Sequence, residues 1–179
     1  FISGLLFALP LCKGDSLIKI VGELESASYI DLTLGSLKEF GIVIERPDSK
    51  TFLIKGKQSY KPNDTIVEGD YSNAAFFEAL NFIGGSVEIS GLKPESMQGD
   101  RVYKALFSKI EREEFPIDIS DCPDLAPILF AMAAYHGRGE FVGTRRLKIK
   151  ESDRAEAMKQ ELEKMGAEFK IAKDNRNAV

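Results

Sequence analysis

The stretch Lys150-Glu151-Ser152-Asp153-Arg154 opens a segment whose apolar residues recur with the spacing of an amphipathic helix, predicted over 152–165. Two earlier helical segments open in a similar way, with Tyr29-Ile30-Asp31 and Gly99-Asp100-Arg101. In each case the aspartate follows a glycine by nine or ten residues. An acid in the first turn of a helix is favoured by the helix dipole, so the recurrence has a physical cause. It indicates an internal repeat.

The repeated unit has an apolar helix, a glycine, a short β-rich run, an amphipathic helix and a further strand. The predicted helices cover 1–12, 28–40, 73–82, 101–110, 123–135 and 152–165. The predicted strands cover 16–21, 41–45, 51–55, 87–89, 115–119, 141–142 and 167–171. Such units pack against one another because one alone cannot bury its apolar face. The pair Phe76-Phe77 is expected in the core.

Turn residues gather at 58–70, where Lys61-Pro62-Asn63-Asp64 and Gly69-Asp70 interrupt the regular patterns. This break predicts a domain boundary or hinge, with one domain over 1–66 and another over 67–179. The alternative is a loop within a single domain.

The composition narrows the functional classes. The 179 residues carry a net charge of −4, which argues against a nucleic-acid binder. Cys12, Cys122 and His136 are too few and too scattered for a metal site, and we expect all three to serve packing. The apolar start, 1–12, is too short to span a bilayer and lacks the basic residues of a signal peptide. We therefore expect a cytoplasmic protein without a membrane segment, whose first residue here is not its natural start.

A local concentration of cations surrounds the opening stretch. Residues 143–154 contain five Lys or Arg side chains and two acids. A helix N-terminus attracts anions, and neighbouring Lys and Arg add charge-assisted donors. A carboxylate in such a cluster is a candidate proton carrier. The window predicts a site for a phosphorylated or carboxylated small molecule.

Four stretches together resemble one enzyme family. They are Phe1-Ile2-Ser3-Gly4-Leu5-Leu6-Phe7-Ala8-Leu9-Pro10-Leu11, Ser26-Ala27-Ser28-Tyr29-Ile30-Asp31-Leu32-Thr33-Leu34, Val67-Glu68-Gly69-Asp70-Tyr71-Ser72-Asn73-Ala74-Ala75-Phe76-Phe77, and Lys150-Glu151-Ser152-Asp153-Arg154 followed by Ala157-Met158. In this order they resemble the 5-enolpyruvylshikimate-3-phosphate synthases (3-phosphoshikimate 1-carboxyvinyltransferases). The resemblance spans almost the whole chain, and its last motif is the most specific.

The resemblance implies an α/β (α+β) fold of two domains, each made of three βαβαββ units in an inside-out α/β barrel. The active site of the family lies in the cleft between the domains. This chain would hold the end of the first domain, over 1–66, and about two units of the second, over 67–179. The fold is therefore expected to be incomplete, with the hinge near 67–70.

The reaction implied by the resemblance belongs to the synthesis of aromatic amino acids. The enolpyruvyl group of phosphoenolpyruvate passes to the 5-hydroxyl of shikimate 3-phosphate, and phosphate is released. The resemblance implies neither a metal nor an organic cofactor. The partners implied are these two small molecules, with no nucleic acid and no membrane.

The family's functional residues match four charged positions here. Asp124 matches the aspartate that contacts the ring hydroxyls and accepts a proton, and Glu151 matches the acid that moves the proton at the methylene carbon. Lys150 matches a ligand of shikimate 3-phosphate, and Arg154 matches a ligand of phosphoenolpyruvate. On a continuous helix Lys150 and Arg154 would share a face. The alternative for all four is a structural role at a helix start or on a solvated surface.

Three further positions match with alternatives left open. Ser26 matches a serine that binds the substrate phosphate, although a serine before a helix is also a common N-cap. Tyr29 matches a tyrosine near the shikimate ring, or is part of the core. Arg146 falls where some members carry a polar ligand, and its role stays open.

Several family features are not found in this sequence. A Ser-Ser-Gln triplet would precede Phe1, and lysine and arginine ligands from other parts of the family sequence are also missing. The resemblance thus predicts a fragment of a monomeric protein, with little turnover alone and an apolar surface prone to self-association. Three other functions compete: a UDP-N-acetylglucosamine enolpyruvyltransferase, a non-catalytic anion-binding module, and a structural scaffold.

Overall fold

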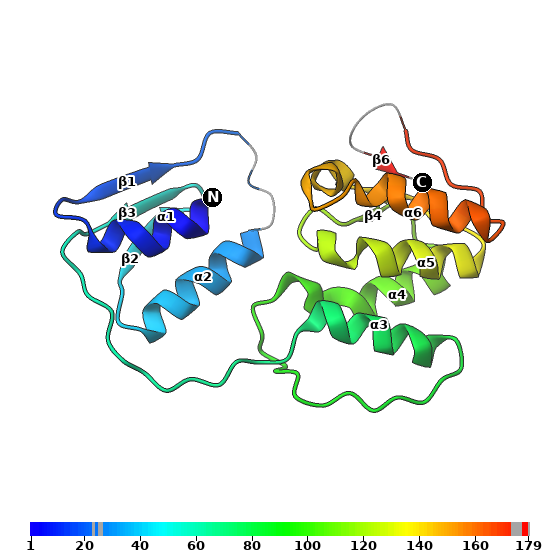
Figure 1. The fold of residues 1–179 in the computed structure, drawn as a ribbon, viewed down its shortest axis with the longest axis horizontal. Coiled ribbons are helices and arrows are strands. Elements are labelled where there is room, and N and C mark those ends of the chain that lie inside the picture. Colours follow the sequence, from blue (N-terminus) through cyan, green and yellow to red (C-terminus); the bar gives the residue numbers. More distant parts are fainter. Residues whose placement is uncertain (23, 25–26, 173–176, 179) are drawn as a thin grey trace. The chain divides into compact units, whose positions relative to one another are not determined.

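A computed structural model describes residues 1–22, 24, 27–172 and the backbone of 177–178. The chain forms two compact units, Phe1–Val67 and Glu68–Val179 (Figure 1). The division lies next to the boundary predicted from the turn-rich segment. That these units belong to the first and second domains of a larger enzyme stays a prediction.

The first unit packs two helices on one face of an antiparallel sheet. Its elements are α1 (Ile2–Ala8), η1 (Leu9–Leu11), β1 (Ser16–Lys19), α2 (Ala27–Glu39), β2 (Ile44–Asp48) and β3 (Thr51–Ile54). The strand order is β1-β3-β2, with Leu17 opposite Leu53 and Ile44 opposite Ile54. Alternation along β3 buries Phe52 and Ile54 and exposes Leu53. The buried side chains meet Leu6, Ile30 and Leu37 of the two helices.

The second unit is mainly helical, with a small mixed sheet (Figure 1). Its helices are α3 (Tyr71–Phe82), η2 (Gly99–Val102), α4 (Tyr103–Glu111), η3 (Pro123–Leu125), α5 (Ala126–His136), η4 (Thr144–Ile149) and α6 (Arg154–Lys164). Its strands are β4 (Ile117–Asp118), β5 (Phe141–Val142) and β6 (Asn177–Ala178). β5 pairs with β4 in parallel and with β6 in antiparallel. Because the connection between β4 and β5 carries α5, the unit contains a β–α–β crossover.

The core of the second unit surrounds α5. Leu125, Leu129 and Phe130 are buried there, and the helix packs against α3, α4 and α6. The Phe130 ring stands edge-on to that of Phe141 in β5, at 4.9 Å between centroids. The apolar face of α5 therefore fixes the position of η3 directly before it, and η3 carries a predicted site residue, Asp124.

Two predicted strands of the second unit are absent. Residues 87–89 form no strand, because the Asn81 side chain satisfies the backbone of Val87: its Nδ2 donates to the Val87 carbonyl at 2.8 Å, and its Oδ1 accepts from the Val87 N–H at 2.6 Å. Residues 167–170 form no regular structure, and Ile171 forms only an isolated bridge. Both runs have β-rich composition, but composition alone supplies no partner strand.

Some packing predictions were also wrong. Phe76 and Phe77 are exposed, because α3 turns its small residues, including Ala75 and Ala79, toward the core. Cys12 and His136 are exposed as well, whereas Cys122 is buried as predicted.

The three repeated aspartates have three different surroundings. Asp31 accepts a hydrogen bond from Arg46 Nη1 at 2.5 Å, which ties α2 to β2. Asp153 is the N-cap of α6 and accepts from the Glu156 N–H at 3.2 Å. Asp100 is buried in η2. The repeat is therefore a repeat of helix starts, with a different use of each acid.

Among the helices that the structure describes, none is long and apolar enough to cross a membrane.

Candidate functional site

The predicted site residues of the second unit lie beyond the ends of two parallel strands. Asp124 follows β4 and lies in η3, directly before α5. Lys150 follows β5 and η4, and Arg154 is the first residue of α6. Parallel strands end at the same edge of a sheet, so the helices that follow them start close together. The crossover thus brings together residues that are thirty positions apart.

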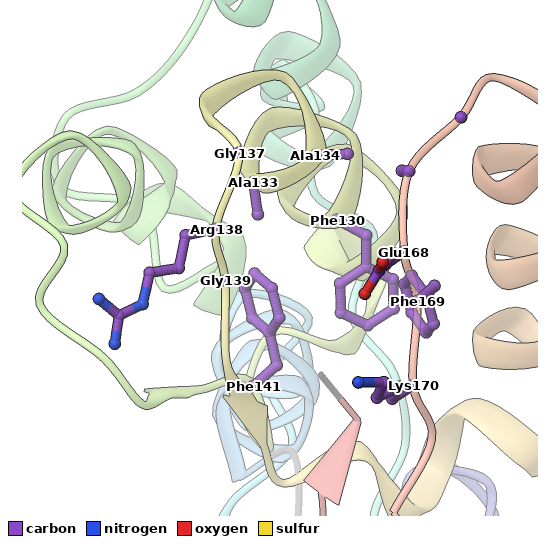
Figure 2. Close-up of a pocket in the computed structure, with 12 residues that line it drawn as sticks. Phe130, Ala133, Ala134, Gly137, Arg138, Gly139, Phe141, Glu168, Phe169 and Lys170 are labelled. Atoms are coloured by element: carbon purple, nitrogen blue, oxygen red, sulfur yellow. The ribbon is translucent and has the colours of Figure 1, made fainter.

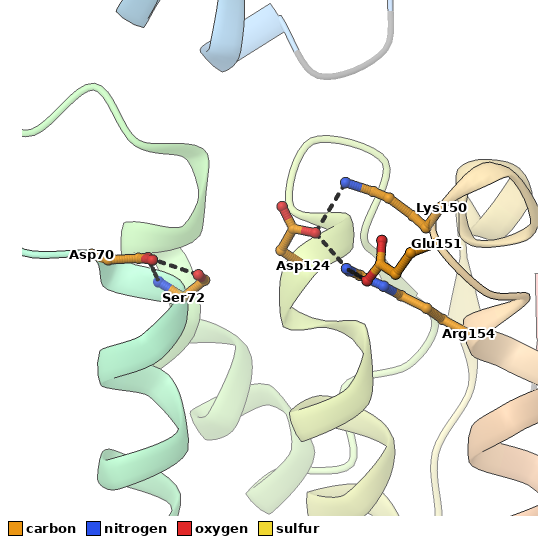
Figure 3. Close-up of polar contacts among 6 residues, drawn as sticks. All are labelled: Asp70, Ser72, Asp124, Lys150, Glu151 and Arg154. Atoms are coloured by element: carbon orange, nitrogen blue, oxygen red, sulfur yellow. Dashed lines mark hydrogen bonds and ion pairs between the residues drawn. The ribbon is translucent and has the colours of Figure 1, made fainter.

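Asp124 is the centre of the ion-pair cluster (Figure 3). Its Oδ1 lies 3.0 Å from Lys150 Nζ and 2.6 Å from Arg154 Nη1. The three side chains are only 18–22% exposed. Because partial burial reduces screening by solvent, these pairs are stronger than ordinary surface ion pairs.

Arg154 links Asp124 to Glu151. Its second terminal nitrogen, Nη2, donates to Glu151 Oε1 at 2.5 Å, so one guanidinium bonds two carboxylates. The hydrogen bond from Arg154 lowers the pKa of Glu151, and the charges of Arg154 and Lys150 act in the same direction. Glu151 is therefore ionised near neutral pH, which suits a proton acceptor. Its side chain is 72% exposed.

Lys150 and Arg154 do not share a helical face, because no helix runs continuously through both positions. Lys150 has an extended backbone, with φ −78° and ψ −170°, and α6 begins only at Arg154. A turn over 150–153, closed by the Asp153 cap, brings both cations to Asp124 instead. Their proximity therefore comes from convergence on a shared carboxylate oxygen.

A cavity of about 430 Å³ adjoins this cluster, and the starts of three helices contribute to its wall. Asp124, Glu151 and Arg154 contribute to the wall from two of these starts. The other lining residues are Ser72, Asn73, Phe76, Pro127, Ser152, Ala157 and Met158. Helix N-termini favour anions, so the wall suits the ligand class predicted from the cation-rich window.

The contribution of α3 to this wall was missed from the sequence. Asp70 caps α3: its Oδ1 accepts from the Ser72 N–H at 2.8 Å and from Ser72 Oγ at 2.7 Å (Figure 3). Its Oδ2 accepts from Asn73 Nδ2 at 2.9 Å. The signal was present as an aspartate two positions before a serine at a helix start. These bonds hold Ser72 and Asn73 at the cavity edge.

Lys150 pairs with Asp124 but is not among the residues that line this cavity. Ser26 lies outside the described residues. Tyr29 lies on α2 of the first unit and is 38% exposed, so it is not ordinary core. Arg146 is half-buried in η4.

A second cavity, of about 500 Å³, lies near the C-terminal end of α5 (Figure 2). Phe130, Phe141 and Phe169 contribute aromatic surface, and Arg138, Glu168 and Lys170 contribute charge. No predicted site residue lines it. Within the part of the chain that the structure describes, no group of three or more His, Cys, Asp or Glu side chains is arranged to hold a metal ion.

Comparison with known proteins gives a consistent family. The family model described as EPSP synthase (3-phosphoshikimate 1-carboxyvinyltransferase) matches residues 1–179. A 3-phosphoshikimate 1-carboxyvinyltransferase of Clostridium kluyveri is 43% identical over 185 residues, which cover 94% of this chain and 43% of the relative. The protein of that name from Clostridium acetobutylicum is 44% identical over 183 residues, with the same coverage of both chains. One from Clostridioides difficile is 40% identical and covers 98% of this chain and 44% of the relative.

The chain thus spans less than half the length of these curated relatives. Within that span the match includes the whole of both units. The chain belongs to the EPSP synthase (3-phosphoshikimate 1-carboxyvinyltransferase) family.

Proposed function

We propose that the protein transfers the enolpyruvyl group of phosphoenolpyruvate to the 5-hydroxyl of shikimate 3-phosphate and releases phosphate. The observation that carries the proposal is the placement of Asp124, held by Lys150 and Arg154, at the edge of a cavity of about 430 Å³. The relatives from Clostridium kluyveri and Clostridium acetobutylicum are named 3-phosphoshikimate 1-carboxyvinyltransferases, which supports shikimate 3-phosphate as the acceptor and the enolpyruvyl group as the group transferred.

The reaction is an addition followed by an elimination. The acceptor hydroxyl attacks the phosphate-bearing carbon of phosphoenolpyruvate, loses its proton, and the methylene carbon gains a proton to become a methyl group. The tetrahedral intermediate then loses phosphate, and the methyl carbon gives up a proton to restore the double bond. A protein that catalyses this must hold two anions together and move protons at two atoms.

We assign Asp124 as the acceptor of the hydroxyl proton. Glu151 is assigned as the group that moves the proton at the methylene carbon. Lys150 and Arg154 would bind the anionic groups of shikimate 3-phosphate and phosphoenolpyruvate, respectively. Both cations already pair with Asp124, so substrate anions would share or replace those contacts. The assignment of Ser26 and Tyr29 to shikimate 3-phosphate is part of the same proposal.

The experiment measures phosphate release by the full-length protein in which this sequence occurs. Shikimate 3-phosphate and UDP-N-acetylglucosamine are supplied separately as acceptors, each with phosphoenolpyruvate. The proposal expects turnover with the first acceptor alone. Turnover with the second alone would assign the related enolpyruvyltransferase instead.

Asp124→Asn separates catalysis from binding alone. Loss of a general base costs about 10²–10⁴ in rate, so the variant should lose turnover by this factor and keep binding shikimate 3-phosphate in calorimetry. Near-normal turnover would exclude Asp124 as the proton acceptor. Absence of binding by the unmodified protein would leave a scaffold role.

Three further points extend the proposal. The units Phe1–Val67 and Glu68–Val179 would belong to the first and second domains of the enzyme, and the 179-residue chain alone would show little turnover.

Cys12 and Cys122 are free thiols, as is usual in the reducing cytoplasm, where we place the protein. The enzyme would be monomeric, whereas the isolated chain would self-associate through exposed residues such as Phe77 and Leu80, as sedimentation velocity would detect.

A further inference from the structure

Asp100 is a buried carboxyl group next to the site. It lies in η2 and is 5% exposed. Its Oδ1 is buried and has no hydrogen-bond partner among the residues that the structure describes. Buried carboxyl oxygens are normally paired, and an unpaired one is costly when it is charged. Packing alone therefore does not explain why an aspartate occupies this position.

The groups around Asp100 are those of the site. Asp70 at the start of α3 and Asp124 in η3 repel its negative charge, and Lys150 at the end of η4 attracts it. The buried thiol of Cys122 is also close enough to be influenced by the Asp100 charge. η2 also packs directly on α3 and α4. Of these neighbours, Lys150 is the one that favours the ionised form.

Burial, followed by the charges of Asp124 and Asp70, raises the pKa of Asp100 from 3.8 to about 6. At neutral pH the carboxyl is therefore mostly ionised but close to its point of protonation. A modest added negative potential is enough to change its charge.

We propose that Asp100 takes up a proton when an anion binds in the cavity lined by Asp124, Glu151 and Arg154. The anion adds negative charge near Asp100 and competes for Lys150. Both effects favour the neutral carboxyl, which gains its proton from solvent.

The uptake changes the charge behind the site. Neutral Asp100 no longer repels the bound anion, and Lys150 is no longer shared between Asp100 and the ligand. Asp124 remains the negative partner of Lys150 and Arg154. This inference rests on the proposed function in so far as the bound anions are the phosphate and carboxylate groups of those substrates.

The experiment counts protons by calorimetry. Shikimate 3-phosphate is titrated into the full-length protein at about pH 7 in buffers of different ionisation enthalpy, and the slope gives the protons taken up per ligand. The Asp100→Asn variant cannot take up this proton, so we expect its uptake to be lower by up to about one proton. Protonation of the ligand phosphate affects both proteins equally and cancels in the difference.

A matched control is Asp121→Asn, which removes one exposed carboxylate near η3, the helix start that carries Asp124. It should retain the uptake of the unmodified protein. Equal uptake by Asp100→Asn and the unmodified protein would overturn the inference.

Carbon-13 NMR of the aspartate carboxyl groups gives a second measurement, which needs no folded variant. The titration midpoint of Asp100 should rise when sulfate, an anion with no proton to exchange near neutral pH, is added. An unchanged midpoint in the presence of bound sulfate would contradict the inference. If sulfate raises the midpoint but shikimate 3-phosphate does not bind, the inference holds and the proposed function fails.

Discussion

Arg154 Nη1 lies 2.6 Å from Oδ1 of Asp124 and so joins the start of α6 to the helix start before α5. The same guanidinium also bonds Glu151. Two carboxylates proposed to move protons are thus held by one planar group. The distance between them is set by the fork of an arginine, which no other side chain reproduces.

Arg154→Lys should therefore be costly although it keeps the charge. One ammonium cannot hold both carboxylates in the same geometry, and a charge-assisted hydrogen bond contributes about 1.5–3 kcal/mol. We expect kcat/KM of the full-length protein to fall about 10–100-fold. Lys150→Arg is the matched control, since it also keeps the charge but leaves the fork intact; it should lose less. An equal loss in both variants would argue against the fork.

The same substitution should move the pH profile. The hydrogen bond from Arg154 is the main cause that lowers the pKa of Glu151, so its removal returns this pKa upward. If ionised Glu151 is needed, the acidic limb of kcat/KM should shift to higher pH in Arg154→Lys. A limb that keeps its position would assign it to another group.

Asp100 should make stability depend on pH. Its pKa is raised in the folded protein, so between pH 3.8 and about 6 the folded state binds more protons than the unfolded state. Stability therefore falls as pH rises through this window, by about 3 kcal/mol. Asp100→Asn removes this pH dependence. The free energy of unfolding of the variant should therefore increase relative to that of the unmodified protein as pH rises from about 4 to 7. Urea unfolding at several pH values measures the difference, and parallel curves would contradict it.

Substitution of two glycines, Gly84 and Gly143, by alanine should distinguish the cost of backbone strain from the cost of steric crowding. Gly143 and Gly84 both have positive φ, 73° and 97°, but a Cβ at Gly143 would lie 2.7 Å from the Ser120 N–H nitrogen, while a Cβ at Gly84 would meet nothing within 4 Å. Gly84→Ala should cost about 1–2 kcal/mol from strain alone. Gly143→Ala should cost about 1–3 kcal/mol more from crowding. Equal shifts in the urea midpoint would show that the connection from β5 to η4 adapts freely.

The two cysteines should differ in reactivity. Burial raises the pKa of Cys122 to about 12, so its reactive thiolate is scarce in the folded protein. Cys12 is exposed. A thiol-reactive dye should label Cys12 in the native state and both residues after denaturation, and Cys12→Ser should remove the native signal. Native labelling of that variant would mean that the region around Cys122 opens readily.

Much of the helical framework could be predicted from the sequence, because local patterns determine it. The apolar run before His136 predicted α5, and the spacing of apolar residues after Arg154 predicted α6. The predictions of strands at 87–89 and 167–171 were wrong, because a strand needs a partner strand and local composition does not reveal whether one is available. The side-chain amide of Asn81 makes the hydrogen bonds to the Val87 backbone that a partner strand was expected to make.

The sequence predicted which charged side chains lie together better than it predicted how they are brought together. Asp124, Lys150, Glu151 and Arg154 do come together. The reason is tertiary, however: two parallel strands end at one edge, and the turn before α6 brings Lys150 back toward Asp124. Helical spacing could not reveal this, nor could it reveal that Asp100 would be buried.

The irregular segment between α3 and η2 is tied back to the start of α3 by side chains. Tyr71 Oη donates to the Lys93 carbonyl at 2.9 Å, and Gln98 Nε2 donates to Glu68 Oε1 at 2.9 Å and to the Gly69 carbonyl at 2.9 Å. Between these ties Ser96 is buried and donates to Glu68 Oε1 at 2.7 Å, whereas residues 83–88, nearer to α3, are exposed. The exposed stretch 83–88 is thus where an insertion, such as a label, is tolerated, while the ties farther along keep the start of α3 anchored beside the cavity.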